Sequence, residues 1–262
     1  MMKMDVSPIQ GGPWLLATYQ PVSLFSLKSA LATSSGGKTV LVPTPYAVKM
    51  ALLSAAIRLR GVAYGRNLFP VLRDLRIGLR VPERLVVING FGKVRRPWEP
   101  PKQKGSDRDA AEARARLKGT FPWNSTIAYR EYVQFGSALE FAFASASDDA
   151  AGSDLAAVTP LLCCINYLGR RGGFVQLAGI PEPADELPSG YHTLTQEGAG
   201  AFGLDWTLHT LDDCGPSLTF DQANIYTRER IALGRGRVLR HIPLPLRLAQ
   251  SSRSFSLYQR ID

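Results

Sequence analysis

Cysteine is scarce in this chain of 262 residues, which contains three. Cys163 and Cys164 are adjacent within the apolar run LLCCI, and Cys214 stands alone. An odd number without a framework spacing argues against a disulfide scaffold. No CxxC motif and no pairing of histidine with cysteine offers four zinc ligands. We therefore expect three reduced cysteines in the core, no metal and no other cofactor.

Long apolar runs are also missing, although 45% of the residues are hydrophobic. No uninterrupted run reaches the roughly 20 residues that a membrane-spanning helix needs. The first residues, MMKMDVSPIQGGPW, lack the apolar stretch of a secretory signal. The mean hydropathy is −0.05, which is typical of a soluble globular protein. We expect a cytoplasmic protein with a sizeable core and no membrane partner.

A complete phosphate-binding loop is absent, despite the sequence GGKT at residues 36–39. The motif G-x-x-x-x-G-K-[ST] would need a glycine at the position of Ala32 and a helix directly after Thr39. The strand-like run VLVP follows instead, and the next helix signal comes only after Pro43. We expect a flexible basic loop here, and not a site for a nucleoside triphosphate.

Signatures of catalysis are missing as well. The motif G-x-S-x-G does not occur, and His192, His209 and His241 lack the spacing H-E-x-x-H. A lone histidine on a strand is more often structural than catalytic. If one were catalytic, the expected chemistry is metal-independent RNA cleavage. Histidine or tyrosine would then assist the 2′-OH, and lysine or arginine would stabilise the phosphorane.

Charge, in contrast, is abundant and unevenly distributed, with a net charge of +9. Residues 58–104 contain twelve Lys or Arg and three Asp or Glu, whereas residues 140–225 contain two Lys or Arg and twelve Asp or Glu. Residues 226–262 are basic again, with eight Lys or Arg and two Asp or Glu. This segregation predicts a basic surface built from two separated segments. Such a surface attracts polyanions, of which nucleic acid is the leading candidate.

The clearest element is a helix that begins after Thr44, a suitable N-cap followed by Pro45, and ends at Gly61. Its small apolar residues recur at helical spacing, so we expect Lys49, Arg58 and Arg60 near the edges of its packing. The remaining pattern predicts strands at 14–27 with a bend at Pro21, at 39–43, 84–90, 127–145 and 172–180. It predicts helices at 69–78 and from Thr159, and a loop or helix entry at 146–160. Short strands are expected at 204–211, 217–220, 238–246 and 254–261. We expect an α+β fold with an antiparallel sheet.

Residues 93–119 differ from their surroundings because they are rich in proline and then in charge. Few large apolar residues are available there to bury surface. Two interpretations stay open, a mobile or extended insertion and an ordinary long surface loop with an amphipathic turn.

Two glycine-rich basic segments complete the pattern. INYLGRRGGFVQL, residues 165–177, places two arginines between glycines and flanks them with Tyr167 and Phe174. LGRGRVLRH, residues 233–241, is similar. Glycine permits close approach of backbone to a ligand, arginine binds phosphate with two parallel hydrogen bonds, and aromatic rings stack on bases. Each segment is also compatible with a plain hairpin turn. Together with the charge segregation they favour RNA binding.

Three stretches resemble the Cas-five family of CRISPR-associated proteins, within the RAMP superfamily. They are a first strand with a glycine-rich loop leading into VPTPYAVKMALLSAAI, the run RLVVINGFGKVRR before a charged insertion, and YLGRRGGFVQL. The resemblance covers about the first two thirds of the chain. It implies one ferredoxin-like (RRM-like) RAMP domain over residues 1–262. A thumb hairpin would be inserted at 91–135, and residues 180–262 would form a β-rich C-terminal portion.

The resemblance also implies a function. Members of the family cap one end of a Cascade-like effector complex, bind the 5′ handle of the CRISPR RNA and contact the backbone and large subunits, with target DNA near the PAM as a further partner. Most are not enzymes, but one branch cuts precursor CRISPR RNA, and that alternative stays open. A generic RNA-binding module without a CRISPR context is a third.

By this interpretation, ten residues form the RNA-binding set. Handle phosphates would be contacted by Lys38, Lys49, Arg170 and Arg171. Tyr167 or Phe174 would stack on a base or line the handle pocket. The base of the thumb would carry Lys93, Arg95, Arg96 and Trp98.

Overall fold

The computed structural model of the chain describes residues 13–30, 37–100, 107–196, 203 and 205–261. Within these residues it contains four helices and twelve strands. The helices are α1 (Pro45–Asp74), α2 (Arg108–Leu117), α3 (Ala151–Leu162) and α4 (Phe220–Ala223). The strands are β1 (Trp14–Pro21), β2 (Arg76–Arg80), β3 (Arg84–Pro97), β4 (Trp123–Phe135), β5 (Leu139–Ala144), β6 (Val175–Leu177), β7 (Glu182–Ala184), β8 (Tyr191–Thr193), β9 (Thr207–Cys214), β10 (Arg237–Leu244), β11 (Leu246–Ser251) and β12 (Phe255–Arg260).

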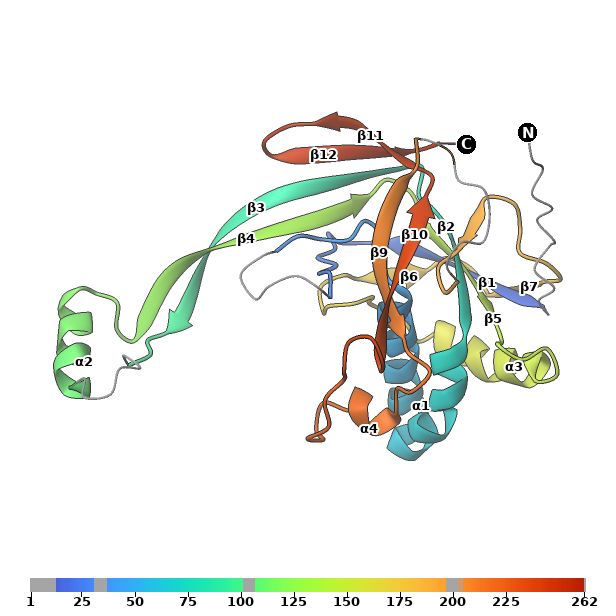
Figure 1. Ribbon diagram of the computed structural model, residues 1–262, viewed down its shortest axis with the longest axis horizontal. Coiled ribbons are helices and arrows are strands. Elements are labelled where there is room, and N and C mark those ends of the chain that lie inside the picture. Colours follow the sequence, from blue (N-terminus) through green and yellow to red (C-terminus); the bar gives the residue numbers. More distant parts are fainter. Residues whose placement is uncertain (1–12, 31–36, 101–106, 197–202, 204, 262) are drawn as a thin grey trace.

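The body is built on an antiparallel sheet with the strand order β6-β1-β5-β2-β8, and β7 pairs with β1. The chain follows the path β1-α1-β2, leaves for the hairpin β3-β4, and returns as β5-α3-β6. Helices α1 and α3 pack against each other on one side of this sheet (Figure 1). The mixed α and β composition and the antiparallel sheet confirm the class that the sequence pattern predicts.

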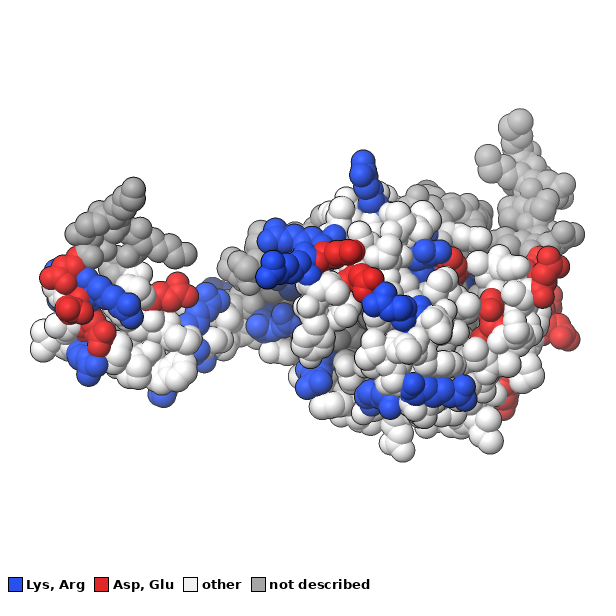
Figure 2. All heavy atoms as spheres, turned by 90° about the horizontal axis from the view of Figure 1, so that it is seen from below, with Lys and Arg blue, Asp and Glu red and all other residues white. Residues whose placement is uncertain are grey.

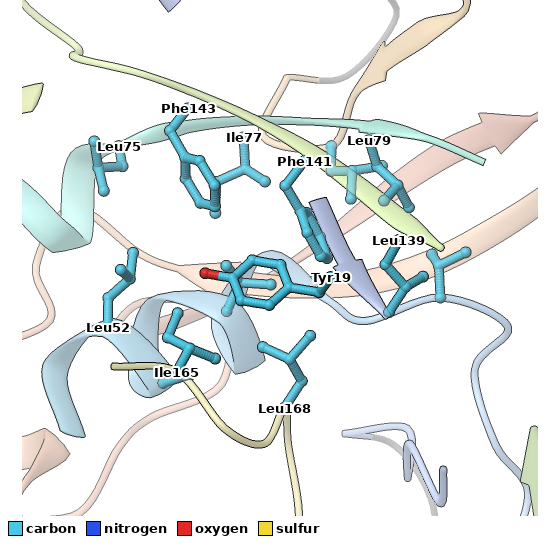
Figure 3. Packing of buried hydrophobic residues seen from close by; sticks show 14 of the residues in the cluster. Tyr19, Leu52, Leu75, Ile77, Leu79, Leu139, Phe141, Phe143, Ile165 and Leu168 are labelled. Carbon is cyan, nitrogen blue, oxygen red and sulfur yellow. The ribbon is translucent and has the colours of Figure 1, made fainter. Parts of the chain in front are cut away.

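The core lies between this sheet and α1. Alternate residues of β1 point inward, and Tyr19 is 1% exposed because it lies among Leu52, Phe141 and Leu168 (Figure 3). The Tyr19 hydroxyl donates a hydrogen bond of 2.8 Å to the carbonyl of Leu162, at the end of α3. Sheet and helices are thus joined by apolar contact and by one buried hydrogen bond.

Helix α1 begins as predicted, because the Thr44 side chain accepts a hydrogen bond from the amide of Ala47 and Pro45 occupies the first turn. Gly61 interrupts the helix with φ of 84° and ψ of 172°. The chain then resumes a helical path up to Asp74, whereas residues 76–80 form β2. The separate helix predicted at 69–78 is therefore corrected, because its first half continues α1 beyond a kink and its second half is a strand.

A long arm leaves the body (Figure 1). It consists of β3 and β4, which pair continuously from Leu85 opposite Phe135 to Pro97 opposite Trp123, with α2 beyond the strands. The Asp107 side chain caps α2 by accepting hydrogen bonds from the two amides after residue 108. The described part of residues 93–119 thus holds strand and helix, and residues 101–106 lie outside the described part.

The C-terminal strands attach to two places. Strand β12 pairs with β3 and β11, which gives a second sheet in the order β11-β12-β3-β4. Strands β9 and β10 form a separate hairpin, and β9 packs against α1. This hairpin carries charged residues on both of its faces.

Several local predictions are corrected by packing. Residues 39–43 form only an isolated bridge between Thr39 and Lys28, and the Thr39 amide donates to the Glu131 side chain instead of to a sheet partner. SLTF is not a strand, since Thr219 caps the short helix α4. Helix α3 begins at Ala151, eight residues before the expected Thr159. Cys163 is exposed, which corrects its expected place in the core. No described helix has the length and apolar character needed to cross a membrane.

Candidate functional site

The RRGG segment is a tight hairpin turn that presents two arginines. Tyr167 and Phe174 face each other across an isolated bridge, and the Leu168 amide donates to the Gly173 carbonyl at 3.0 Å. Gly169 and Gly172 have φ of 73° and 116°, values that favour glycine. Arg170 and Arg171 are exposed at the tip. The turn is therefore rigidly shaped while its guanidinium groups reach solvent.

Ser23 fastens this turn to the segment after β1. Its hydroxyl donates to the Gly172 carbonyl at 2.5 Å and accepts from the Phe174 amide at 2.8 Å. Gly173 lies so close to Phe25 that an added Cβ would sit 2.9 Å from the ring. The turn is thus docked on the body, which fixes the positions of its arginines relative to the neighbouring segments.

The GGKT sequence lies beside the arm. The Glu131 amide donates to the Gly37 carbonyl at 2.8 Å, and a Cβ at Gly37 would sit 2.2 Å from the Tyr129 carbonyl oxygen. The Thr39 amide donates to Glu131 Oε2 at 2.9 Å. The glycine thus permits close contact with β4, and Lys38 is exposed beside it. The first part of the predicted flexible loop, residues 31–36, lies outside the described residues.

Two hollows adjoin where the arm meets the body, and we call them together the neck groove. The larger has a volume of about 440 Å³ and lies between α1, the turn at Tyr167 to Arg170 and the hairpin β9-β10. The smaller, of about 170 Å³, lies against the arm at Arg96 and Arg130. The two hollows have Ser26, Lys28 and Arg170 in common among their lining residues.

The neck groove is basic. Its lining contains five basic side chains, which are Lys28, Arg96, Arg130, Arg170 and Arg237. Among the described residues that line it, Asp212 is the one carboxylate. Figure 2 shows Lys and Arg side chains gathered around the junction of arm and body. A concave surface with such a surplus of positive charge attracts an anionic chain.

Arg237 is held in place by two neighbours. Its Nε donates to Asp212 Oδ2 at 2.6 Å, and its guanidinium lies over the Tyr46 ring at 4.2 Å from the centroid. Burial raises the pKa of Tyr46, although the charge of Arg237 acts in the opposite direction. The Tyr46 hydroxyl therefore stays protonated at neutral pH and serves the groove as a neutral hydrogen-bonding group.

The structure brings together part of the predicted set. Tyr167, Arg170 and Arg96 line the neck groove. Arg171 and Phe174 belong to the same turn, and 47% of Phe174 is exposed. Lys38 follows Gly37, which lines the smaller hollow. The register of β3 places Lys93 and Arg95 on the opposite face of the arm from Arg96, because successive strand residues alternate.

Two predicted residues are placed elsewhere. Trp98 lies farther out on the arm, where its ring is 5.8 Å from that of Phe121. Lys49 is 1% exposed and its ammonium is bonded to Asp213 at 2.7 Å. The expectation that Lys49 lies near an edge and contacts phosphate is thus corrected, because Lys49 is buried and paired with Asp213 of β9.

Lys28, Arg130 and Tyr46 also line the neck groove but lie outside the predicted set. Arg130 belongs to a segment with an ordinary strand pattern, Lys28 directly follows the strand expected at 14–27, and Tyr46 lies at a helix start. For Arg130, the sequence signal is the alternation in IAYREYVQF. This alternation places Arg130 on the opposite strand face from Val133, which points into the core. The basic segment LGRGRVLRH did indicate Arg237.

The three histidines lie apart from the neck groove. His209 Nε2 is 2.7 Å from Thr207 Oγ1, and burial lowers the pKa of His209 to about 4. The His192 ring packs edge-on against Trp206, and His241 Nδ1 lies 3.2 Å from Thr210 Oγ1. None of them lines either hollow of the groove.

Comparison with known proteins gives a match in sequence and matches in structure. No protein-family model matches the chain. A CRISPR-associated protein Cas5 of Archaeoglobus fulgidus is 33% identical over 91 residues, which make up 33% of this chain and 40% of that protein. The match thus spans well under half of that relative. A crystal structure of a CRISPR protein from the same organism aligns with 95% of this chain and 92% of that chain, at 13% identity and a TM-score of 0.44. The sequence match confirms the resemblance inferred from the motifs: over these 91 residues the chain is similar to a CRISPR-associated protein Cas5.

Proposed function

We propose that this protein is a non-catalytic, guide-RNA-binding subunit of a CRISPR interference complex. It binds the 5′ handle of the CRISPR RNA in the neck groove and caps the backbone filament. The observation that carries the proposal is the basic lining of the groove, where five cations face one carboxylate. Phosphate contacts of this kind supply most of the affinity of proteins for nucleic acid.

The fold supports the same proposal. The path β1-α1-β2-β5-α3-β6 with strand order β6-β1-β5-β2 supports the assignment of a ferredoxin-like unit, whose elements follow the order β-α-β-β-α-β. We assign this unit to the RAMP domain and treat residues 1–262 as that one domain, with residues 180–262 as its β-rich portion. The hairpin β3-β4, within which residues 91–135 lie, is inserted between β2 and β5 and would act as the thumb.

Each part of the groove has a role in this assignment. Arg170, Arg171, Lys28 and Lys38 contact phosphates, because they project from fixed backbone around the hollow. Phe174, which is 47% exposed, offers a ring on which a base can stack. Tyr167 lines the larger hollow with Tyr46, so one nucleotide can be held between aromatic and charged groups.

The arm extends the basic surface away from the body. Arg96 continues the groove along one face, whereas Lys93 and Arg95 carry charge on the other face beside Phe91, which is 74% exposed. We propose that the arm lies over the guide RNA and approaches the backbone subunit beside it. Contact with the large subunit and with target DNA near the PAM belongs to the same assignment. Trp98 supports the outer arm through Phe121.

The deciding experiment is retention of RNA in the assembled complex. Arg170→Ala combined with Arg171→Ala should reduce the CRISPR RNA that copurifies with the complex, because two phosphate contacts are lost. The control is Arg228→Ala with Arg230→Ala, two exposed arginines outside the lining of the groove. Unchanged retention in the first variant would refute the proposal.

The non-catalytic part of the proposal has its own test. The described histidines lie outside the groove, so a bound RNA would not meet an imidazole there. Incubation of the pure protein with repeat RNA in EDTA should leave the RNA intact. Specific cleavage that disappears when one histidine is replaced would instead identify a metal-independent ribonuclease.

A further inference from the structure

A second charged hollow lies on the other side of the hairpin β9-β10. Its volume is about 410 Å³, and its lining has no residue in common with the neck groove. Asp212 of β9 lines the neck groove, and the next residue, Asp213, lines this hollow. Successive residues of a strand point to opposite faces, so the two hollows are separated by the hairpin itself.

Three buried or half-buried charges form the floor of this hollow. Lys49 Nζ donates to Asp213 Oδ1 at 2.7 Å and to the Arg73 carbonyl at 2.7 Å. Asp213 Oδ2 also accepts from Arg240 Nε at 2.9 Å. One carboxylate therefore faces two cations, and the cluster keeps one positive charge.

Arg76, which lines the side of the hollow, adds a second positive charge. Arg76 donates to the Ser145 carbonyl at 2.8 Å, and its nearest carboxylate, that of Asp148, is 3.8 Å away and 66% exposed. The remaining charged pair of the lining, Arg73 with Asp74, is joined by two hydrogen bonds and is neutral. Among the described residues that line this open hollow, Arg240 and Arg76 thus leave a surplus of two positive charges, which Asp148 beside Arg76 reduces.

We infer that this hollow is a binding site for one compact oxyanion, a carboxylate or a phosphate group. A guanidinium offers several donors in one plane, which suits both groups. The carboxylates of Asp74 and Asp148 border the site and repel a polyanionic strand more strongly than a single anionic group. The site is separate from RNA binding in the neck groove and goes beyond that function.

The test is calorimetric titration of the full-length protein with inorganic phosphate and, separately, with succinate at constant ionic strength. Saturable binding of either anion above a chloride reference is expected. Arg240→Gln should weaken it about tenfold or more, because a hydrogen bond to a charged group is lost. Binding of phosphate alone would assign a phosphate ester as the natural group, and binding of succinate alone would assign a carboxylate.

Two further variants keep the outcome interpretable. Arg76→Gln removes the other surplus cation without touching Asp213, so it should weaken binding even if Arg240→Gln proves unstable. Arg228→Gln with Arg230→Gln removes two exposed arginines that line neither this hollow nor the neck groove and should leave the titration unchanged. Heats equal to those of chloride, or equal loss in the Arg228 and Arg230 variant, would overturn the inference. Neither result would bear on RNA retention.

Discussion

The ammonium of Lys49 and the carboxylate of Asp213 lie 2.7 Å apart in the interior, and their side chains are 2% and 1% exposed. They join α1 to β9 across 164 positions of sequence. The pair holds the hairpin β9-β10 against the helix, and the same hairpin carries Arg237 into the neck groove. A buried ion pair thus connects the stability of the body with the shape of the candidate site.

Removal of one partner should be costly. Lys49→Ala leaves Asp213 buried with Arg240 as its remaining cation, so the free energy of unfolding should fall by about 3 kcal/mol. Urea unfolding followed by circular dichroism measures this change. Arg247→Ala, an exposed position on β11, is the control and should change it by no more than about 0.5 kcal/mol. A loss below about 1 kcal/mol for Lys49→Ala would contradict the structural role.

The Lys49 pair also shows where prediction from sequence stops. The start of α1 was predictable because Thr44 and Pro45 act locally, within one turn. The burial of Lys49 was not, since its partner lies on a distant strand and no local pattern points to it. The helix end expected at Gly61 is a kink within α1, which continues to Asp74. The helical path beyond it depends on nonlocal packing such as that of Phe69 against Phe220, at 6.0 Å between ring centroids.

The candidate site also has one part that could be predicted from the sequence and one part that could not. The turn with Arg170 and Arg171 was predictable because glycines and arginines in one short segment encode both shape and charge. The neck groove around it was not, because Lys28, Arg130 and Tyr46 come from three segments that meet only in the folded chain. The antiparallel α+β class followed from periodicity, whereas the length of the arm depended on pairing between β3 and β4 across a charged insertion.

Gly37 should tolerate no side chain, because an added Cβ would sit 2.2 Å from the backbone oxygen of Tyr129. Gly37→Ala should lower the free energy of unfolding by about 1–3 kcal/mol and weaken RNA binding, since Lys38 moves with the loop. Gly92→Ala is a matched control, because nothing lies within 4 Å of the added carbon there. Chemical unfolding of both variants measures the difference, and equal stability would contradict the close approach.

The salt dependence of RNA binding should report the phosphate contacts. In the isolated protein, Arg170→Ala with Arg171→Ala should reduce the slope of log K against log salt by about 1.4, or about 0.7 for each contact to single-stranded RNA. Fluorescence anisotropy with a labelled handle RNA at several salt concentrations gives this slope. The pair Arg228→Ala and Arg230→Ala should leave it unchanged. A lower affinity with an unaltered slope would mean that the arginines do not contact phosphate.

Stability should fall in mild acid because of His209. Burial holds its pKa at about 4, whereas an unfolded histidine has a pKa of about 6.5. The unfolded state therefore takes up the proton first. The contribution of His209 is complete above pH 6.5 and is lost as the pH falls towards 4, by about 3 kcal/mol in total. Burial also lowers the pKa of His192, which acts in the same direction.

Comparison with a variant isolates the share of His209. The unfolding free energies of the native protein and of His209→Gln, measured between pH 4 and 7, should differ in slope, with the variant less sensitive to pH. Parallel curves would show that the proton is taken up equally by the folded and unfolded states.

The outer arm should be dispensable for folding and needed for RNA. Lys93 pairs with Ile127, so replacement of residues 94–126 by Asn-Gly closes the hairpin with a two-residue turn. None of the described residues removed belongs to the hydrophobic core of the body, and contacts such as that of Arg116 over Phe121, at 4.2 Å, lie within the arm. The midpoint of thermal unfolding should therefore change by no more than about 4 °C. RNA retention should fall, because Arg96 and its neighbours in the groove are gone. Loss of cooperative unfolding would instead show that the arm is part of the folding unit.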